Sequence, residues 1–234
     1  MRLLGVLGLL VLAGLAAGAA RAGATNECKG LQVCVRVAGP WVVVPPSHGT
    51  PRTAVQYQLS CPKGFVVGGL DAELSDRAID IDFSALVGSP VNPGVTTGRA
   101  ALFRAVYTAA APRGPTFRPH VGCIPSAGGG SGPVPYRVLA AYPPGQPTVR
   151  RVRTVRVQQG DRRVVTVCAP GERLLSGWHA VGFYAAAPPS ADLISRVSTA
   201  QHVRGNRVDV RARVAALLGA RAVIQVGAVC GGGS

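Results

Sequence analysis

The sequence predicts an all-β protein made of two tandem, disulfide-closed, β-sandwich-like units. Two stretches of equal length carry this prediction, Cys61 to Cys123 and Cys168 to Cys230, with a separation of 62 positions in each. In each stretch, a strand-like run ends in the first cysteine, a glycine follows three residues later (Gly64 and Gly171), and a final apolar run ends in the second cysteine. Short β-branched runs bounded by Pro and Gly recur along the chain, and helical periodicity is weak.

The two stretches also match each other internally when the sequence is shifted by 107 positions. The matching pairs are Cys61/Cys168, Gly64/Gly171, Gly98/Gly205, Arg104/Arg211, Ala105/Ala212 and Cys123/Cys230. The match needs no gap, so we expect a duplication. Residues 25–126 form β unit 1, a Gly/Ser linker covers 127–132, and residues 133–234 form β unit 2.

Residues 1–24 have the layout of a secretory signal peptide. Arg2 supplies a basic start, an apolar run extends from Leu3 to Ala20, and small residues offer cleavage before Gly23 or before Thr25. A membrane anchor is the alternative, but Gly and Ala dilute the apolar run. We therefore expect a secreted, extracellular protein with no integral membrane segment in the mature chain.

The cysteines of the expected mature chain number six, and an even number in an exported protein predicts disulfides. The expected pairs are Cys28–Cys34, Cys61–Cys123 and Cys168–Cys230. The main alternative joins Cys34 to Cys61. We do not expect Cys28 and Cys34 to bind a metal ion, because their spacing is wide and no second ligand pair lies nearby.

The strands of unit 1 follow from alternation and from turn residues. A strand over 32–37 is followed by 41–46, which two prolines end. In 53–61, Val55, Tyr57 and Leu59 share one face. The return strand 65–70 contains Gly68 and Gly69, which suggest a bulge or a close backbone approach. Further strands are expected over 79–83, 100–108 and 116–123.

Unit 2 is expected to repeat this plan. A strand over 136–142 ends at two prolines, and strand 149–158 turns through 158–161 into strand 162–168 as a hairpin. The remaining strands are expected over 174–183, 207–215 and 220–230, and weak helical periodicity occurs near 191–197 and 214–218.

The formal net charge is +15, with 25 basic against 10 acidic residues. Such an excess favours polyanions such as anionic wall polymers, lipid head groups or nucleic acid. The candidate anion-binding residues are Arg150, Arg151, Arg153, Arg156, Arg162 and Arg163 in the predicted 149–163 hairpin, together with strand 204–213. A GC-rich genome, which enriches Arg along with Ala, Gly, Pro and Val, is the alternative explanation of the charge.

The acidic residues of unit 1 include Asp80 and Asp82, which alternate with Ile79, Ile81 and Phe83. Two carboxylates on one face of a strand could form part of a calcium site or a catalytic pair. They could equally form the solvated face of an edge strand, which protects against aggregation. We favour the solvated face and keep Asp80 and Asp82 as weak metal-ligand candidates.

Cys61-Pro-Lys-Gly64, followed by Gly68-Gly69 and a strand ending in cysteine, is similar to a repeat of secreted bacterial proteins of uncharacterised function. The whole chain also looks like exported actinobacterial proteins of GC-rich genomes. The second copy departs from the pattern, because Ala169 precedes Pro170 and Gly177-Trp178 replaces Gly-Gly. The resemblance implies a disulfide within each unit and transfers no catalytic residue.

Catalytic motifs are weak in this sequence. His48, His120, His179 and His202 have no spacing typical of a metal site, and His179 is interpreted as a structural histidine. If all cysteines are paired, no thiol nucleophile remains. We therefore expect no cofactor and a non-catalytic envelope or extracellular binding module whose partner is an anionic cell-wall polymer or another envelope protein. An arginine-rich polyanion-binding protein, with a wall polymer or nucleic acid as ligand, is the alternative. A secreted hydrolase is a minor one.

Overall fold

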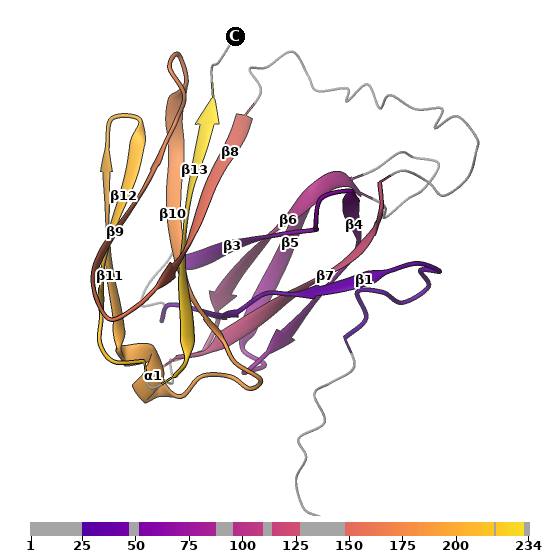
Figure 1. Cartoon of the computed structure of the whole chain (residues 1–234), viewed down its shortest axis with the longest axis horizontal. Coiled ribbons are helices and arrows are strands. Elements are labelled where there is room, and N and C mark those ends of the chain that lie inside the picture. Colours follow the sequence, from indigo (N-terminus) through magenta and orange to yellow (C-terminus); the bar gives the residue numbers. More distant parts are fainter. Residues whose placement is uncertain are drawn as a thin grey trace, which may run out of the picture.

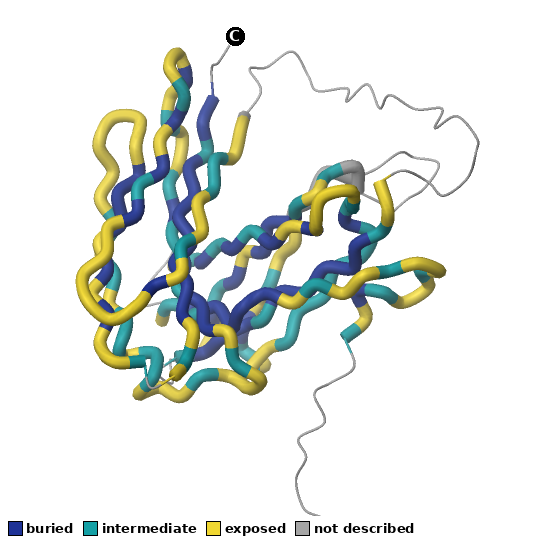
Figure 2. Tube along the Cα trace, viewed as in Figure 1, coloured by how far each residue is buried: buried dark blue, intermediate teal, exposed yellow. Residues whose placement is uncertain are grey.

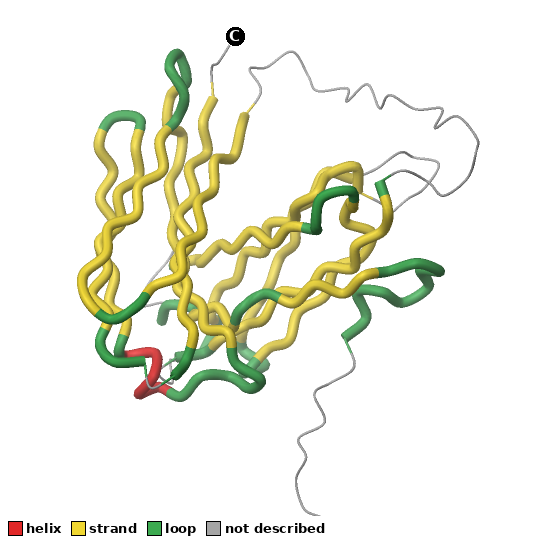
Figure 3. The backbone as a smooth tube through the Cα atoms, viewed as in Figure 1, coloured by secondary structure: helices red, strands yellow, loops and turns green. Residues whose placement is uncertain are grey.

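The computed structural model describes residues 25–46, 52–87, 96–109, 114–126, 148–217 and 219–231. These residues are almost entirely β-strand, and the one helix among them is short (Figure 3). The all-β prediction is therefore confirmed. The predicted signal peptide, the linker 127–132 and the predicted strand 136–142 lie outside the described residues.

The elements follow one another along the chain with similar spacing in its two halves, residues 25–126 and 148–231. The first half contains β1 (Val35–Ala38), β2 (Trp41–Val43), β3 (Ala54–Ser60), β4 (Phe65–Leu74), β5 (Ile79–Val87), β6 (Thr96–Tyr107) and β7 (Thr116–Pro125). The second half contains β8 (Thr148–Val157), β9 (Gly160–Val167), β10 (Arg173–Tyr184), α1 (Ala191–Ser195), β11 (Val197–Arg204), β12 (Arg207–Val214) and β13 (Arg221–Gly231).

Three sheets are formed, and every strand pairing is antiparallel (Figure 1). A seven-stranded sheet spans both halves: β4 pairs with β7, β7 pairs with both β1 and β2, and β2 continues the sheet to β10, β13 and β8. Two three-stranded sheets cover it, with the orders β3-β6-β5 and β11-β12-β9. The first half contributes β1, β2, β4 and β7 to the large sheet, and the second half contributes β8, β10 and β13. Each half packs these strands against a small sheet of its own.

The two small sheets lie on opposite faces of the large sheet. Where β2 meets β10, Val42 lies opposite Gly182 and Trp41 lies opposite Phe183. Directly opposite residues share a face, and Val42 belongs to the core of the first half whereas Phe183 belongs to the core of the second. The second half is thus turned over relative to the first along the shared sheet.

Local details recur 107 positions apart in the two halves. A bulge interrupts the β4–β7 pairing between Val67 and Gly69, and a bulge interrupts β10–β13 between Leu174 and Ser176. The amide of Cys61 donates to the carbonyl of Arg99, and the amide of Cys168 donates to that of Asn206. Gly64 and Gly171 both have a φ near +85°, at +85° and +84°, in the turn after these cysteines.

Each half has its own buried core between the shared large sheet and its small sheet; buried residues are dark blue in Figure 2. Phe103 and Phe117 are fully buried in the first, and Ile224 and Phe183 in the second. The predicted disulfides Cys28–Cys34, Cys61–Cys123 and Cys168–Cys230 are confirmed. The two long ones join the end of β3 or β9 to β7 or β13, so each staples the small sheet to the large sheet.

The sequence missed strand β11 entirely and predicted a hairpin between β8 and β9 that is wrong. β8 pairs with β13 in the large sheet, while β9 pairs with β12 in a small sheet. The residues between β8 and β9 therefore form a corner of the sandwich, which buries Val157 of β8 and Val164 of β9 in one core. β11 was missed because its inward side chains, Thr199 and Gln201, are polar. The weak periodicity at 214–218 corresponds to no helix in residues 214–217.

The two halves are joined by polar contacts as well as by the β2–β10 pairing. The amide side chain of Gln225 on β13 accepts from the backbone N–H of Gln58 (2.6 Å) and donates to the backbone carbonyl of Gln58 (2.9 Å). Gln58 lies on β3, an edge strand of its sheet. The Gln225 side chain therefore occupies the place of a neighbouring strand and holds β3 against the second half. Nearby, burial and then the Tyr184 hydroxyl raise the pKa of Tyr57 far above its ordinary value.

Candidate functional site

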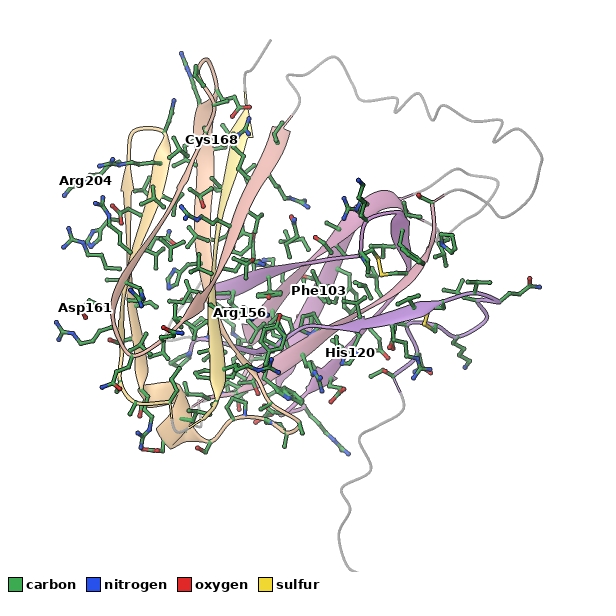
Figure 4. All side chains as sticks on the ribbon, in the orientation of Figure 1. Phe103, His120, Arg156, Asp161, Cys168 and Arg204 are labelled. Carbon is green, nitrogen blue, oxygen red and sulfur yellow. A yellow bond between two sulfur atoms is a disulfide. The ribbon has the colours of Figure 1, made fainter. Side chains whose placement is uncertain are left out.

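The six arginines predicted to bind anions lie on different surfaces of the second half. Arg150 and Arg156 share a face of β8 with Thr154, whose hydroxyl accepts a hydrogen bond from Gln225, so this face looks toward the first half. In Figure 4, Arg156 lies in the middle of the molecule, whereas Arg204 and Asp161 lie at its outer side. The structure therefore divides the predicted cluster.

Arg151 and Arg153 lie on the opposite face of β8, beside the core of the second half. Arg151 donates two hydrogen bonds to Glu172, at 2.8 Å and 2.5 Å. Glu172 is buried, and its pKa is lowered chiefly by the hydrogen bonds from Arg151 and then by the backbone N–H of Ala169. Arg151 is thus a structural counter-ion of Glu172. Arg153 and Arg162 are exposed.

Arg163 belongs instead to a new grouping on the outer face of the sheet β11-β12-β9. On β12, the alternate residues Val208, Val210 and Ala212 are buried, so the residues between them point outward. The outward arginines of the three strands form what we call the arginine face: Arg163, Arg204, Arg207, Arg211 and Arg213, all exposed. The sequence had pointed to strand 204–213, but it could not join Arg163 to that strand without the β9–β12 register.

The register places like charges directly opposite each other on this face. Arg204 of β11 lies opposite Arg207 of β12, and Arg163 of β9 lies opposite Arg211 of β12. Directly opposed like charges destabilise a sheet. The face carries five arginines against Asp161 and Asp209, which leaves an excess of three positive charges on a rigid three-stranded surface.

Asp209 is the counter-ion at the centre of the arginine face. Its side chain is buried and accepts hydrogen bonds from the Arg163 guanidinium, including one from Nε at 2.9 Å. The pKa of Asp209 is lowered first by these hydrogen bonds, and the positive charges of Arg207 and Arg211 lower it further. Arg213 lies 3.4 Å from Asp161. Among the described residues, no carboxylate lies within ion-pair distance of Arg204, Arg207 or Arg211.

A shallow hollow of about 650 Å³ lies within the arginine face. It is lined by Ser198, Thr199 and Ala200 of β11 and by residues of β12 and β9. Its charged lining residues are Asp161, Arg162, Arg163, Arg211 and Arg213. A small anionic group placed over Ala200 would therefore meet several guanidinium donors, which bind phosphate, sulfate and carboxylate oxygens in a bidentate manner.

Asp80 and Asp82 lie on the exposed face of β5, an edge strand, as predicted. Asp82 pairs with Arg104 of the neighbouring strand at 3.1 Å. In the part of the chain that the structure describes, the one group of three possible metal ligands drawn together is Cys168, Glu172 and Cys230. Both of these cysteines are in a disulfide.

The histidines occupy three distinct environments, and His48 lies outside the described residues. The ring nitrogens of His179 contact Gln201 and Thr199, each at 2.9 Å, as expected for a structural histidine. His202 is exposed at the border of the arginine face. His120 is buried, with Nε2 2.9 Å from Glu73 and Nδ1 3.8 Å from Glu27.

The cluster of Glu27, Glu73 and His120 was not foreseen from the sequence. Glu27 is far from both partners along the chain and carries no motif. Its backbone carbonyl fits a hollow that only the missing side chains of Gly69 and Gly122 leave open. This packing fixes the segment around Cys28–Cys34 against β4 and β7, so we assign the cluster a structural role.

No helix within the described ranges is long and apolar enough to cross a membrane. Comparison of the chain with protein-family models, with curated proteins and with solved structures gives no match.

Proposed function

We propose that the protein is a secreted, non-catalytic binding module that holds an anionic polymer on its arginine face. The observation that carries this proposal is the register of β9, β12 and β11, which sets two arginine pairs side by side on one rigid surface. Three of these arginines have no carboxylate within ion-pair distance among the described residues. An anionic ligand would relieve the repulsion within each pair.

The spacing of the pairs favours a polymer over a single small anion. Arg207 and Arg211 are four residues apart on β12, which corresponds to about 13 Å along a strand. Two anionic groups at that separation would each meet one arginine pair, and the strands need no rearrangement to receive them. The chemistry shared by the possible ligands is a chain of phosphate, sulfate or carboxylate groups, such as an anionic wall polymer.

The secreted character and the duplication are parts of the same proposal. Three disulfides and the signal-like residues 1–24 support an oxidising, extracellular location. The matched bulges, turns and strand orders of the two halves support descent from one duplicated unit. In that case the arginine face belongs to the second copy alone, because the corresponding sheet of the first half carries the acidic edge at Asp80 and Asp82.

The test compares two triple variants that remove the same charge. Arg204→Gln/Arg207→Gln/Arg211→Gln removes the arginine face, whereas Arg153→Gln/Arg156→Gln/Arg173→Gln removes three exposed arginines elsewhere in the second half. Binding to heparin and to long-chain polyphosphate is measured by titration at several NaCl concentrations. We expect wild-type binding that weakens steeply with salt.

The face variant should lose at least tenfold in affinity, and its slope of log K against log salt should decrease by about two units, because each phosphate contact contributes somewhat less than one. The matched variant should lose much less. Equal losses in both variants would show that only net charge matters. Absence of wild-type binding at low salt would exclude the proposal.

A further inference from the structure

A cavity of about 530 Å³ lies where the two halves meet. One wall comes from the first half, through Val43, Pro45 and Val55, and the other comes from β10, α1 and β11 of the second half. The remaining lining residues are Pro46, Thr53, Ala54, Gly177, Trp178, His179, Ala180, Val181, Ile194, Val197, Thr199 and Gln201. Its size is within the range of small-molecule sites, which commonly form between domains.

The walls of this cavity are mostly apolar and contain no charged side chain. Valine, proline and alanine residues make up most of the lining, which also includes Trp178. The polar side chains of the lining are those of Thr53, His179, Thr199 and Gln201. A charged ligand would lose its hydration without gaining an ionic partner in this lining. The cavity therefore suits an uncharged molecule with an apolar body.

The hydrogen bonds among His179, Thr199 and Gln201 determine which groups the β10–β11 side of the cavity can offer to a ligand. The Gln201 side-chain N–H group donates to the carbonyl of Gly177 at 3.1 Å, so the Gln201 oxygen faces His179. That oxygen can only accept, so Nδ1 of His179 carries a proton and donates to it. In the tautomer with this single proton, Nε2 of His179 accepts from the Thr199 hydroxyl, 2.9 Å away.

The Thr199 hydroxyl proton is consequently committed to His179, and the lone pairs of Thr199 Oγ1 remain as acceptors. We propose that the cavity is a binding site for one small, uncharged, apolar molecule that carries a hydrogen-bond donor, a hydroxyl or an N–H group, directed at Thr199 Oγ1. Thr199 and the outward residues Ser198 and Ala200 alternate on β11, so this site and the arginine face use opposite faces of one strand. The site does not depend on the proposed polyanion binding.

The probe for this site is N-phenyl-1-naphthylamine, an uncharged aromatic molecule with one N–H donor that fluoresces more strongly when it leaves water. It is titrated into the full-length protein while the probe fluorescence is recorded. Excitation of tryptophan should also produce probe emission, because Trp178 lines the cavity. We expect a saturable increase that corresponds to one probe per chain and that does not weaken as NaCl is raised.

Three variants locate the probe. Thr199→Val keeps the shape but removes the acceptor, so affinity should fall about fivefold, the effect of one neutral hydrogen bond. Thr199→Ser keeps the hydroxyl and should bind as the wild type does. Ala54→Phe fills the cavity from the opposite wall and should abolish saturable binding. Ser176→Ala, which removes an exposed hydroxyl from β10 outside the cavity lining, serves as the control.

Circular dichroism and thermal melts of each variant establish that it folds. The proposal is overturned if the wild type gives no saturable signal, or if folded Ala54→Phe binds the probe as the wild type does. It is also overturned if Thr199→Ser loses as much affinity as Thr199→Val, since the acceptor would then play no part. Ala54→Phe keeps the test decisive should Thr199→Val fail to fold.

Discussion

Two buried carboxylates, Asp209 and Glu172, each pair with one arginine of a neighbouring strand in the second half. Asp209 is buried beneath Arg163 on the outer sheet, and Glu172 is buried beside the Cys168–Cys230 disulfide with Arg151 as its donor. In both cases, the arginine lies on a neighbouring strand or loop that is distant in the sequence. The acid thus neutralises one guanidinium and fixes its direction, while other arginines on the same strands stay exposed.

These two carboxylates predict a loss of stability in acid. Both pKa values are lowered in the folded state, so their contribution is complete above the unfolded values of roughly 4. It is lost as the pH falls through the lowered folded values, below about pH 4. Thermal unfolding between about pH 2 and pH 7 should therefore show a steady melting temperature down to about pH 5 and a decline below it.

Substitution identifies the groups responsible for this decline. Asp209→Asn and Glu172→Gln should each lower the melting temperature at pH 7 and flatten the acid decline. Asp82→Asn, at an exposed ion pair with Arg104, should change little. An acid decline in the double variant Asp209→Asn/Glu172→Gln as steep as that of the wild type would assign the effect to other groups.

Among the secondary-structure elements, the edge strand β3 is held against the second half by a side chain of that half. β3 is an edge strand whose backbone groups at Gln58 are satisfied by the side chain of Gln225 rather than by another strand. Gln225 also donates to Thr154 of β8, so one amide joins β13, β8 and β3. A side chain that satisfies a strand edge protects it from pairing with other chains.

Gln225→Leu should destabilise the protein strongly. The substitution keeps the side chain about the same size but removes three hydrogen bonds, and it leaves the N–H and C=O of Gln58 without their partner. An unsatisfied buried group costs about 1–3 kcal/mol, so two fully buried groups would cost about 2–6 kcal/mol. Because the contacts with Gln58 are only partly buried, we expect a loss of about 2–4 kcal/mol in the free energy of unfolding, measured by urea denaturation.

The matched control for this loss is Gln158→Leu, at an exposed position between β8 and β9. The free energy of unfolding of this control should lie within about 0.5 kcal/mol of the wild-type value. A Gln225→Leu variant as stable as this control would mean that water replaces the amide at the edge of β3.

At the scale of the whole molecule, two stapled sandwiches share one sheet. The second half is turned over relative to the first along the shared sheet, so the two small sheets cover opposite faces of that sheet. The arginine face therefore points away from the first half (Figure 1). The two long disulfides occupy matching places, and each encloses the same length of chain. The Cys28–Cys34 disulfide closes only a short loop at the start of the fold.

Loop length predicts the relative importance of the disulfides. In the chain-entropy model, removal of a disulfide with a 62-residue separation costs about 4 kcal/mol, and a separation of six residues costs about 2 kcal/mol. Cys61→Ala/Cys123→Ala and Cys168→Ala/Cys230→Ala should therefore each lower the free energy of unfolding about twice as much as Cys28→Ala/Cys34→Ala. Calorimetry and denaturant titration measure these differences, and equal losses for the short and long loops would contradict the entropic explanation.

The fold class, the three disulfides and the exposed face of Asp80 and Asp82 follow from the sequence alone. The exposed face depends on the alternation of side chains along one strand, and the disulfides depend on the number and spacing of the cysteines. Both can be read without knowing which strands pair. The equal spacing of the cysteines was enough to predict both long disulfides.

The surface that each arginine occupies is visible only in the folded chain. Alternation shows that two residues share a face, but it does not show whether that face is buried or which strand lies beside it. The sequence therefore grouped Arg150 with Arg163, which the sandwich corner at 158–159 separates, and left Arg163 apart from Arg211, which the β9–β12 register joins. Three other features also depend on partners that are distant in the chain: the polar strand β11, the Gln225 contact and the cavity at Thr199. The register between such distant strands is set only when the side chains of both cores pack together.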